Sequence, residues 1–169
     1  SSEMRIDDPR AWGLTVAENG VLLGGACSTV DLAHTYGTPL HVVNEHRLEA
    51  TASNFLREVQ SEYRGKTSVH YAFKCNSVPA IVEVIRRAGL KAEVMTEFEL
   101  QLALHLGFRG EEIIVNGPCK TDSFLRSCLL GGTRLVVIDS LPELHDLAAI
   151  ARSFEADVDI LLRVNPDYV

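Results

Sequence analysis

Short apolar runs alternate along most of the chain with longer segments in which apolar residues recur every three or four positions. A short run rich in β-branched residues is typical of a buried strand, whereas the three- and four-residue spacing is typical of a helix with one apolar face. Six strands are predicted in this way, at 40–43, 68–73, 91–95, 112–115, 134–138 and 159–164. From the second onward they begin about 20 to 25 residues apart, which is the length of one strand and one helix joined by short loops.

Residues that favour helix starts support the helical segments between these strands. The side chains of Asn, Ser and Thr accept hydrogen bonds from the first free N–H groups of a helix. Such residues precede the predicted helices at Asn44, Ser77, Thr96, Thr121 and Ser140. Strands that alternate with helices form a parallel sheet, because each helix carries the chain back over the sheet in a right-handed crossover. The sequence therefore predicts an α/β protein.

The first part of the chain has a different pattern. Two short apolar runs, 14–17 and 21–23, flank an Asn-Gly pair at 19–20, which predicts a β-hairpin. Ser28 or Thr29 can then begin a short helix that ends before the Gly-Thr-Pro at 37–39. Two regions are expected: 1–36 with a tail, hairpin and short helix, and 37–169 with the repeating strands and helices.

A parallel sheet of this size is either doubly wound or closed into a (β/α)8 barrel. No strand runs into the Gly-x-Gly-x-x-Gly turn of a dinucleotide-binding wound sheet. Polar residues lie at the carboxyl ends of successive strands, as at the catalytic rim of a barrel: Lys74, Glu93, Asn116, Asp139, Arg163 and Asn165. A TIM-type barrel is favoured. Since such a barrel takes about 250 residues, 37–169 is expected to be its incomplete N-terminal portion, and the chain to be the first part of a longer or cleaved polypeptide.

Composition and net charge limit the classes of partner that the protein can be expected to bind. The chain has 46% hydrophobic residues and a net charge of −7, so a globular fold is expected and a nucleic acid or an anionic membrane surface is not an expected partner. No apolar run has the length of a membrane helix, and a cytoplasmic protein is expected. The four cysteines lie far apart without the spacing of a metal site, so reduced thiols and no bound metal are expected.

The stretch 69–79 holds the most informative candidate residue. Period-two alternation places Lys74 on one face of the strand with the small Ala72, and Phe73 and Cys75 on the other. The second face suits the helical layer, so Cys75 is expected to pack there. The amine of Lys74 is expected to reach a central pocket from the end of the strand. The pattern alone would not single it out, because most lysines are exposed and inert.

Five short motifs resemble those of the pyridoxal-phosphate enzymes with an alanine-racemase-like barrel (fold type III), in particular the diaminopimelate and ornithine decarboxylase group. Tyr-Ala-Phe-Lys-Cys-Asn at 71–76 is similar to that group's Tyr-Ala-x-Lys-Ala-Asn. The others are Gly-Thr-Pro-Leu-His-Val at 37–42, Ala-Glu-Val at 92–94, Asn-Gly-Pro-Cys-Lys-Thr at 116–121 and Leu-Arg-Val-Asn-Pro at 162–166. Each is short, but their common order and spacing make the resemblance specific.

The resemblance implies a cofactor, a reaction and site residues. The cofactor is pyridoxal 5′-phosphate, carried as an imine on Lys74, and the reaction is decarboxylation of a basic or diamino acid such as diaminopimelate, ornithine or lysine. Glu93 matches an acid near the cofactor, although a charge at a helix start would also explain it. Arg163 matches an arginine beneath the cofactor. Glu99 follows Thr96 by three residues, so a capping box explains it without catalysis.

Two other functions remain open: a pyridoxal-phosphate-dependent amino-acid racemase, and a non-catalytic regulatory relative of the decarboxylases. The Asn-Ser-Val after Lys74 differs from the racemase pattern, which favours decarboxylation. By resemblance, the enzyme is a homodimer, and the N-terminal hairpin belongs to a C-terminal β domain that this chain lacks. The chain alone is therefore expected to be incomplete as an enzyme, with the rest of the polypeptide or a second chain completing the barrel.

Overall fold

The structure is a computed structural model that describes residues 8–166 of the 169-residue chain. The chain divides into two compact units between Ala50 and Thr51. This point lies within helix α2 (Glu45–Glu62), whose first turn is capped where Asn44 Oδ1 accepts the N–H of Arg47 at 3.0 Å. Each unit is described by itself.

The N-terminal unit holds the predicted hairpin. A 3-10 helix, η1 (Pro9–Trp12), precedes strands β1 (Leu14–Val16) and β2 (Leu22–Gly24), which pair antiparallel, and β3 (Cys27–Ser28) adds a third antiparallel strand. Gly20 has φ 82°, a left-handed conformation that the hairpin turn requires and glycine adopts without strain. Helix α1 (Thr29–Tyr36) follows, with Ser28 as its N-cap. The hairpin and the short helix are confirmed.

The predicted first strand at 40–43 is wrong for this structure. The segment contains no strand, and Leu40, Val42 and Val43 are 41%, 60% and 53% exposed. Its β-branched residues favour an extended chain, but a strand also needs a neighbouring strand for its N–H and C=O groups. Such a neighbour is found for none of residues 40–43 in the described chain, so five parallel strands form where six were expected.

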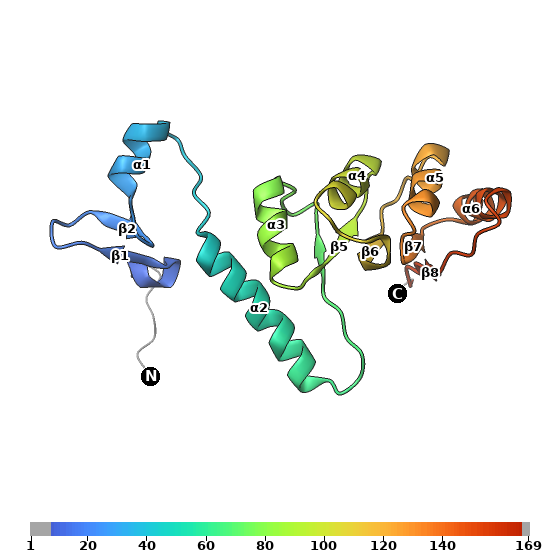
Figure 1. The fold of residues 1–169 in the computed structure, drawn as a ribbon, viewed down its shortest axis with the longest axis horizontal. Helices are drawn as coiled ribbons and strands as arrows, with labels where there is room; N and C mark the ends of the chain where they lie inside the picture. Colours follow the sequence, from blue (N-terminus) through green and yellow to red (C-terminus); the bar gives the residue numbers. More distant parts are fainter. Residues whose placement is uncertain (1–7, 167–169) are drawn as a thin grey trace. The chain divides into compact units, whose positions relative to one another are not determined.

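The second unit is built on a parallel five-stranded sheet (Figure 1). Its strands are β4 (His70–Ala72), β5 (Lys91–Val94), β6 (Ile113–Val115), β7 (Leu135–Ile138) and β8 (Ile160–Leu162). They lie side by side in sequence order, so every crossover steps in the same direction. A doubly wound sheet reverses its strand order at a switch point, whereas a barrel does not. The predicted α/β class and barrel-type architecture are confirmed.

Four helices cover one face of this sheet: α3 (Pro79–Arg87), α4 (Glu97–His105), α5 (Asp122–Leu130) and α6 (Leu141–Ser153). Between them and the strands lies the core, which includes Phe73, Val94, Leu100, Val115, Leu125, Val136 and Leu147, all at most 1% exposed. Thr96, Thr121 and Ser140 cap α4, α5 and α6 as predicted. Ser77 does not cap α3, because that helix begins one residue later, after Val78.

The other face of the sheet is less covered. Ala72, Glu93, Ile114 and Leu135 are Cα partners across β4 to β7, and all four are half-buried. Every residue of β8 is exposed, from 40% at Ile160 to 55% at Leu162. In β5 and β6 the strands therefore bury one set of side chains against helices and leave the alternate set partly accessible, whereas Val137 of β7 is buried on the second face and β8 is exposed throughout.

Candidate active site at the carboxyl edge of the sheet

Lys74 lies in the turn that follows β4 and is exposed. The preceding residue, Phe73, is 1% exposed, and its ring packs against that of Phe108 with centroids 5.9 Å apart. The N–H of Phe73 donates to Glu93 O at 3.0 Å, which ties the chain beside Lys74 to β5. No hydrogen bond or ion pair of the Lys74 amine is found within 8–166. The lysine thus stands on an anchored backbone with its amine available.

The turn after β4 is held by its own hydrogen bonds. The N–H of Cys75 donates to Ala72 O at 3.0 Å, and the hydroxyl of Tyr71 donates to Asn76 O at 3.0 Å. Burial, with a smaller contribution from Cys75, raises the pKa of Tyr71 to about 12, so its hydroxyl keeps its proton for this bond. Cys75 is exposed, and the expectation that it packs on the helical side is wrong. Strand alternation stops at Phe73, because Lys74 and Cys75 belong to the turn.

Glu93 is the third of the four residues of β5. Its Cα partners are Ala72 of β4 and Ile114 of β6, and it is half-buried on the face that the helices leave uncovered. Helix α4 begins only at Glu97, so Glu93 is not a charge at a helix start. A half-buried carboxylate such as that of Glu93 needs a polar partner. Glu93 also lies on β5, the strand that pairs with β4, which leads to Lys74.

Glu99 has the structural role that its spacing predicts. Its N–H donates to Thr96 Oγ1 at 3.1 Å, and its Oε2 accepts the N–H of Met95 at 2.8 Å. The carboxylate thus closes the start of α4 in a variant of the capping box, in which it accepts the N–H of the residue before the cap Thr96. The residue is 9% exposed.

Arg163 follows β8, where its N–H donates to Ile138 O at 2.9 Å. Its side chain is 54% exposed, and its Nε lies 3.7 Å from Asp139 Oδ1. Its apolar neighbours Leu161 and Leu162 are also exposed, at 54% and 55%. The partner that the structure shows for the guanidinium is Asp139, whose side chain is 14% exposed.

Asn116 follows β6 and is half-buried. Its N–H donates to Val94 O at 2.8 Å, and its Oδ1 accepts the N–H of Gly117 at 2.9 Å. Gly117 has φ 108°, and a Cβ there would lie 3.0 Å from Met95 O. Only glycine fits this close approach of the loops after β5 and β6.

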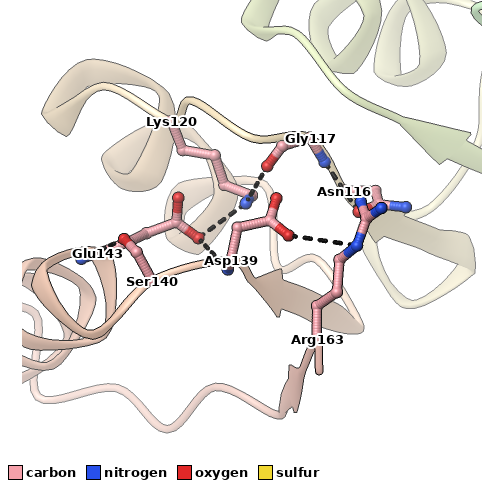
Figure 2. A network of polar contacts seen from close by, with 7 residues as sticks. All are labelled: Asn116, Gly117, Lys120, Asp139, Ser140, Glu143 and Arg163. Atoms are coloured by element: carbon pink, nitrogen blue, oxygen red, sulfur yellow. Dashed lines mark hydrogen bonds and ion pairs between the residues drawn. The ribbon is translucent and has the colours of Figure 1, made fainter. Parts of the chain in front are cut away.

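A buried ion pair beside these residues was not predicted from the sequence. Lys120 Nζ lies 2.8 Å from Glu143 Oε1 and 2.7 Å from Gly117 O, and the Lys120 side chain is fully buried (Figure 2). The position of Glu143 three residues after the cap Ser140 is a recognisable signal for its role at the start of α6. Nothing in the local pattern indicates that a lysine so close to Pro118 is buried, because lysine is ordinarily exposed.

The carboxyl ends of the parallel strands thus carry most of the predicted site residues. Lys74, Asn116, Asp139 and Arg163 follow β4, β6, β7 and β8, and Glu93 is one residue from the end of β5. This edge combines a nucleophilic amine, carboxylates and a guanidinium, which is a set suited to covalent and acid–base catalysis. In the described chain, no three His, Cys, Asp or Glu residues are grouped as metal ligands would be.

The fold and this edge define the class of protein: a barrel-type α/β domain with its polar residues at the carboxyl rim. Residues 46–169 match the family described as "Pyridoxal-dependent decarboxylase, pyridoxal binding domain". The match covers well over half of the chain, which therefore belongs to this family. The family and the pyridoxal cofactor that the five motifs imply are confirmed.

Curated relatives agree. Diaminopimelate decarboxylase of Corynebacterium efficiens is 36% identical over 149 residues, which cover 88% of this chain and 32% of the relative. The enzyme of the same name from Archaeoglobus fulgidus is 30% identical over 149 residues and is covered to 34%. The chain thus spans about a third of the length of these relatives.

Solved structures have the same fold. AQ1208 from Aquifex aeolicus matches with a TM-score of 0.81 at 28% identity, over 90% of this chain and 36% of that one. Diaminopimelate decarboxylase from M. jannaschii matches with a TM-score of 0.82 at 24% identity, over 91% of this chain and 36% of that one. At this identity the second match is evidence of the fold alone.

The residues present fit a pyridoxal cofactor. The amine of Lys74 has no protein partner between residues 8 and 166, so it is free to react with an aldehyde. Arg163 pairs through Nε alone, and its Nη1 and Nη2 atoms make no hydrogen bond within the described residues. Asp139 Oδ2 is buried and has no hydrogen-bond partner there.

Within residues 8–166, no helix combines the length and the apolar character needed to cross a membrane.

Proposed function

We propose that the protein containing this chain is a pyridoxal-phosphate-dependent decarboxylase of a basic or diamino acid. Lys74 supplies the amine that holds the cofactor. The observation that carries the proposal is the placement of this lysine: its amine is exposed and unpartnered at the carboxyl edge of a parallel sheet, on a backbone tied to β5, in a chain of the pyridoxal-binding family. The substrate class is supported by the names of the relatives, which include diaminopimelate decarboxylases.

The chemistry divides between cofactor and chain. Bound pyridoxal phosphate supplies an electron sink for the pair left on Cα when the bond to the carboxylate breaks and carbon dioxide departs. Lys74 would hold the cofactor through its amine. The same amine, when not bonded, would be able to carry a proton near the reacting carbon.

Two further residues belong to the proposed site. Glu93 accepts a hydrogen bond from a polar group that binds over Ala72, its partner on β4. Arg163 would help to hold the cofactor through its two free nitrogens, while its Nε faces Asp139. Both roles follow from half-exposed charged groups on the uncovered face, where a bound ligand would supply the missing polar partner.

We also propose how the rest of the protein completes this chain. Strands β4 and β8 are the two edges of the sheet, and β8 is apolar and exposed, so a further strand from the same polypeptide or a second chain closes the barrel against them. In this proposal 37–169 begins the barrel, and 1–36, with its separate antiparallel sheet, belongs to a second domain. The working unit is a homodimer in the cytoplasm. Light scattering of the natural polypeptide and fractionation of cells test these two statements.

The activity is tested with the natural polypeptide that contains residues 1–169. Diaminopimelate, lysine and ornithine are offered in turn with pyridoxal phosphate, and carbon dioxide and the product amine are measured. Release of carbon dioxide from one of them, lost by at least about a thousandfold in Lys74→Ala, supports the proposal. Lys66→Ala is a matched control, since it removes an exposed lysine before β4 and should leave the activity unchanged.

The same assay distinguishes the other two functions. Inversion at Cα without carbon dioxide would identify a racemase. Binding of neither cofactor nor substrate by a folded protein would identify a non-catalytic relative. Either result would contradict decarboxylation.

A further inference from the structure

Four charged side chains connect the loops after β6, β7 and β8: two cations, Lys120 and Arg163, at the ends, and two carboxylates, Glu143 and Asp139, between them (Figure 2). Lys120 Nζ lies 2.8 Å from Glu143 Oε1, and the same Oε1 accepts the backbone N–H of Asp139 at 3.3 Å. Asp139 Oδ1 then lies 3.7 Å from Arg163 Nε. Glu143 is therefore shared between a buried cation and the backbone of the residue that faces Arg163.

Exposure rises steadily along this series. The side chain of Lys120 is 0% exposed and that of Glu143 is 7%, followed by 14% for Asp139 and 54% for Arg163. The inner pair is also tied to the backbone, because Lys120 donates to Gly117 O at 2.7 Å and the N–H of Glu143 donates to Ser140 Oγ at 3.3 Å. A charge pair at this depth requires well-formed geometry, since either charge alone would be strongly disfavoured. The inner end of the series is thus fixed, and only the outer end, at Arg163, is open to a ligand.

Asp139 is the link between the fixed end and the exposed end. Its backbone is held by Glu143, and its carboxylate carries a buried Oδ2 that has no hydrogen-bond partner in the described part of the chain. Among residues 8–166, Arg163 is the one cation that the structure places beside the Asp139 carboxylate. Because a guanidinium presents its donors in a rigid planar fork, a carboxylate facing Nε limits the directions available to Nη1 and Nη2.

We propose that Asp139 is a positioning residue, which orients the guanidinium of Arg163 along the carboxyl edge of the sheet, and that the buried Lys120–Glu143 pair holds Asp139 in place. One consequence, that Arg163 is aligned for the pyridoxal cofactor, rests on the proposed function. Lys120 and Glu143 contact neither cofactor nor substrate in this account. They act through Asp139, and Asp139 acts through Arg163.

The orientation itself is tested without cofactor. In the natural polypeptide free of pyridoxal phosphate, the Nε–H of Arg163 gives a nuclear magnetic resonance signal that Arg163→Lys removes and so assigns. Exchange of this proton with water is expected to be about tenfold faster in Asp139→Asn, because the asparagine lacks the charge that retains the guanidinium. Glu143→Ala should give a similar increase. Glu143→Gln keeps an oxygen for the N–H of Asp139 and should restore part of the protection.

A matched control separates positioning from general loss of stability. Glu112→Gln alters another glutamate that accepts a backbone N–H, that of Arg109, at the start of β6 and therefore at the opposite edge of the sheet. In the Glu112→Gln variant, the exchange rate of the Arg163 Nε–H proton should equal that of the wild type. If Asp139→Asn leaves the exchange rate at the wild-type value in a folded protein, or if Glu112→Gln raises it equally, the positioning role is refuted.

The consequence for the cofactor is measured as the dissociation constant of pyridoxal phosphate. Asp139→Asn and Arg163→Lys are each expected to weaken binding about tenfold, and the double variant by little more than either alone, since the two residues act in series. If the double variant instead weakened binding by the product of the two single effects, the two residues would act independently, and the proposal that Asp139 acts through Arg163 would be refuted. Failure of the wild type to bind pyridoxal phosphate would refute the proposed function and this consequence, while the exchange rates would still decide whether Asp139 orients Arg163.

Discussion

The two faces of the parallel sheet differ in the burial and the polarity of their side chains. On the helical face, Phe73, Val94, Val115 and Val136 are at most 1% exposed and pack within one continuous core. On the other face, Glu93 is half-buried and Leu161 is 54% exposed. The first face is a finished hydrophobic core, whose residues determine stability. The second bears the polar and reactive groups, so substitutions there should change binding and leave folding largely intact.

The largest effect on stability is expected for Lys120, which joins the polar edge to the core. Lys120→Met leaves the Glu143 carboxylate buried without its cation, at a cost of about 3 to 5 kcal/mol in the free energy of unfolding. Urea denaturation measures this change. Adding Glu143→Leu should recover only part of it, because the N–H of Asp139 then loses its acceptor. Lys66→Met, at an exposed position, is the control and should change stability by less than about 0.5 kcal/mol; an equal loss in both variants would contradict the role of the pair.

The second prediction applies one substitution to both faces. Leu147→Ala, at a position 1% exposed, should lower the free energy of unfolding by about 2 to 5 kcal/mol, because it leaves a cavity beneath α6. Leu161→Ala, at a position 54% exposed, should lower it by less than about 0.5 kcal/mol. The two variants are compared by urea denaturation of the same protein preparation. A large loss at Leu161 would show that the second face is also a closed core.

The smallest effect concerns the cysteines. Burial raises the pKa of the Cys128 thiol to about 12, while Cys75 and Cys119 are exposed. Since the native pKa lies above the unfolded one, the unfolded state loses this proton first as the pH rises. The contribution of Cys128 to stability is therefore complete below the unfolded pKa of about 8.5 and is lost as the pH rises towards the native value.

Two measurements check this prediction. The free energy of unfolding should fall more steeply above pH 9 in the wild type than in Cys128→Ala, a comparison that cancels the similar contribution of Tyr71. Iodoacetamide should also label Cys119 at least about tenfold faster than Cys128 in the native protein. Equal labelling of the two would mean that the helical face opens readily.

The sequence predicted those features that depend on local pattern. The helix caps at Thr96, Thr121 and Ser140 follow from side chains that reach only their own first turn. The alternation from Tyr71 to Phe73 correctly separated the helical face from the other one. The same alternation did not extend to Lys74, which lies in the turn after β4.

Features that depend on distant contacts were not predictable in this way. The segment 40–43 has strand-forming residues and yet no neighbouring strand within the described chain. Cys75 is exposed because the strand ends earlier than its apolar run. Lys120 is buried only because Glu143, 23 residues further along the chain, reaches it from the start of another helix. In each case the outcome was decided by a partner that local periodicity does not reveal.

The central claim, that the amine of Lys74 holds the cofactor, is tested most directly by covalent trapping. The natural polypeptide is incubated with pyridoxal phosphate, reduced with borohydride, digested and mapped by mass spectrometry. The account predicts that one peptide gains the reduced pyridoxal phosphate, at Lys74, and that Lys74→Arg abolishes the modification while Lys66→Arg does not. Stoichiometric modification of another lysine, with Lys74 unmodified, would contradict it.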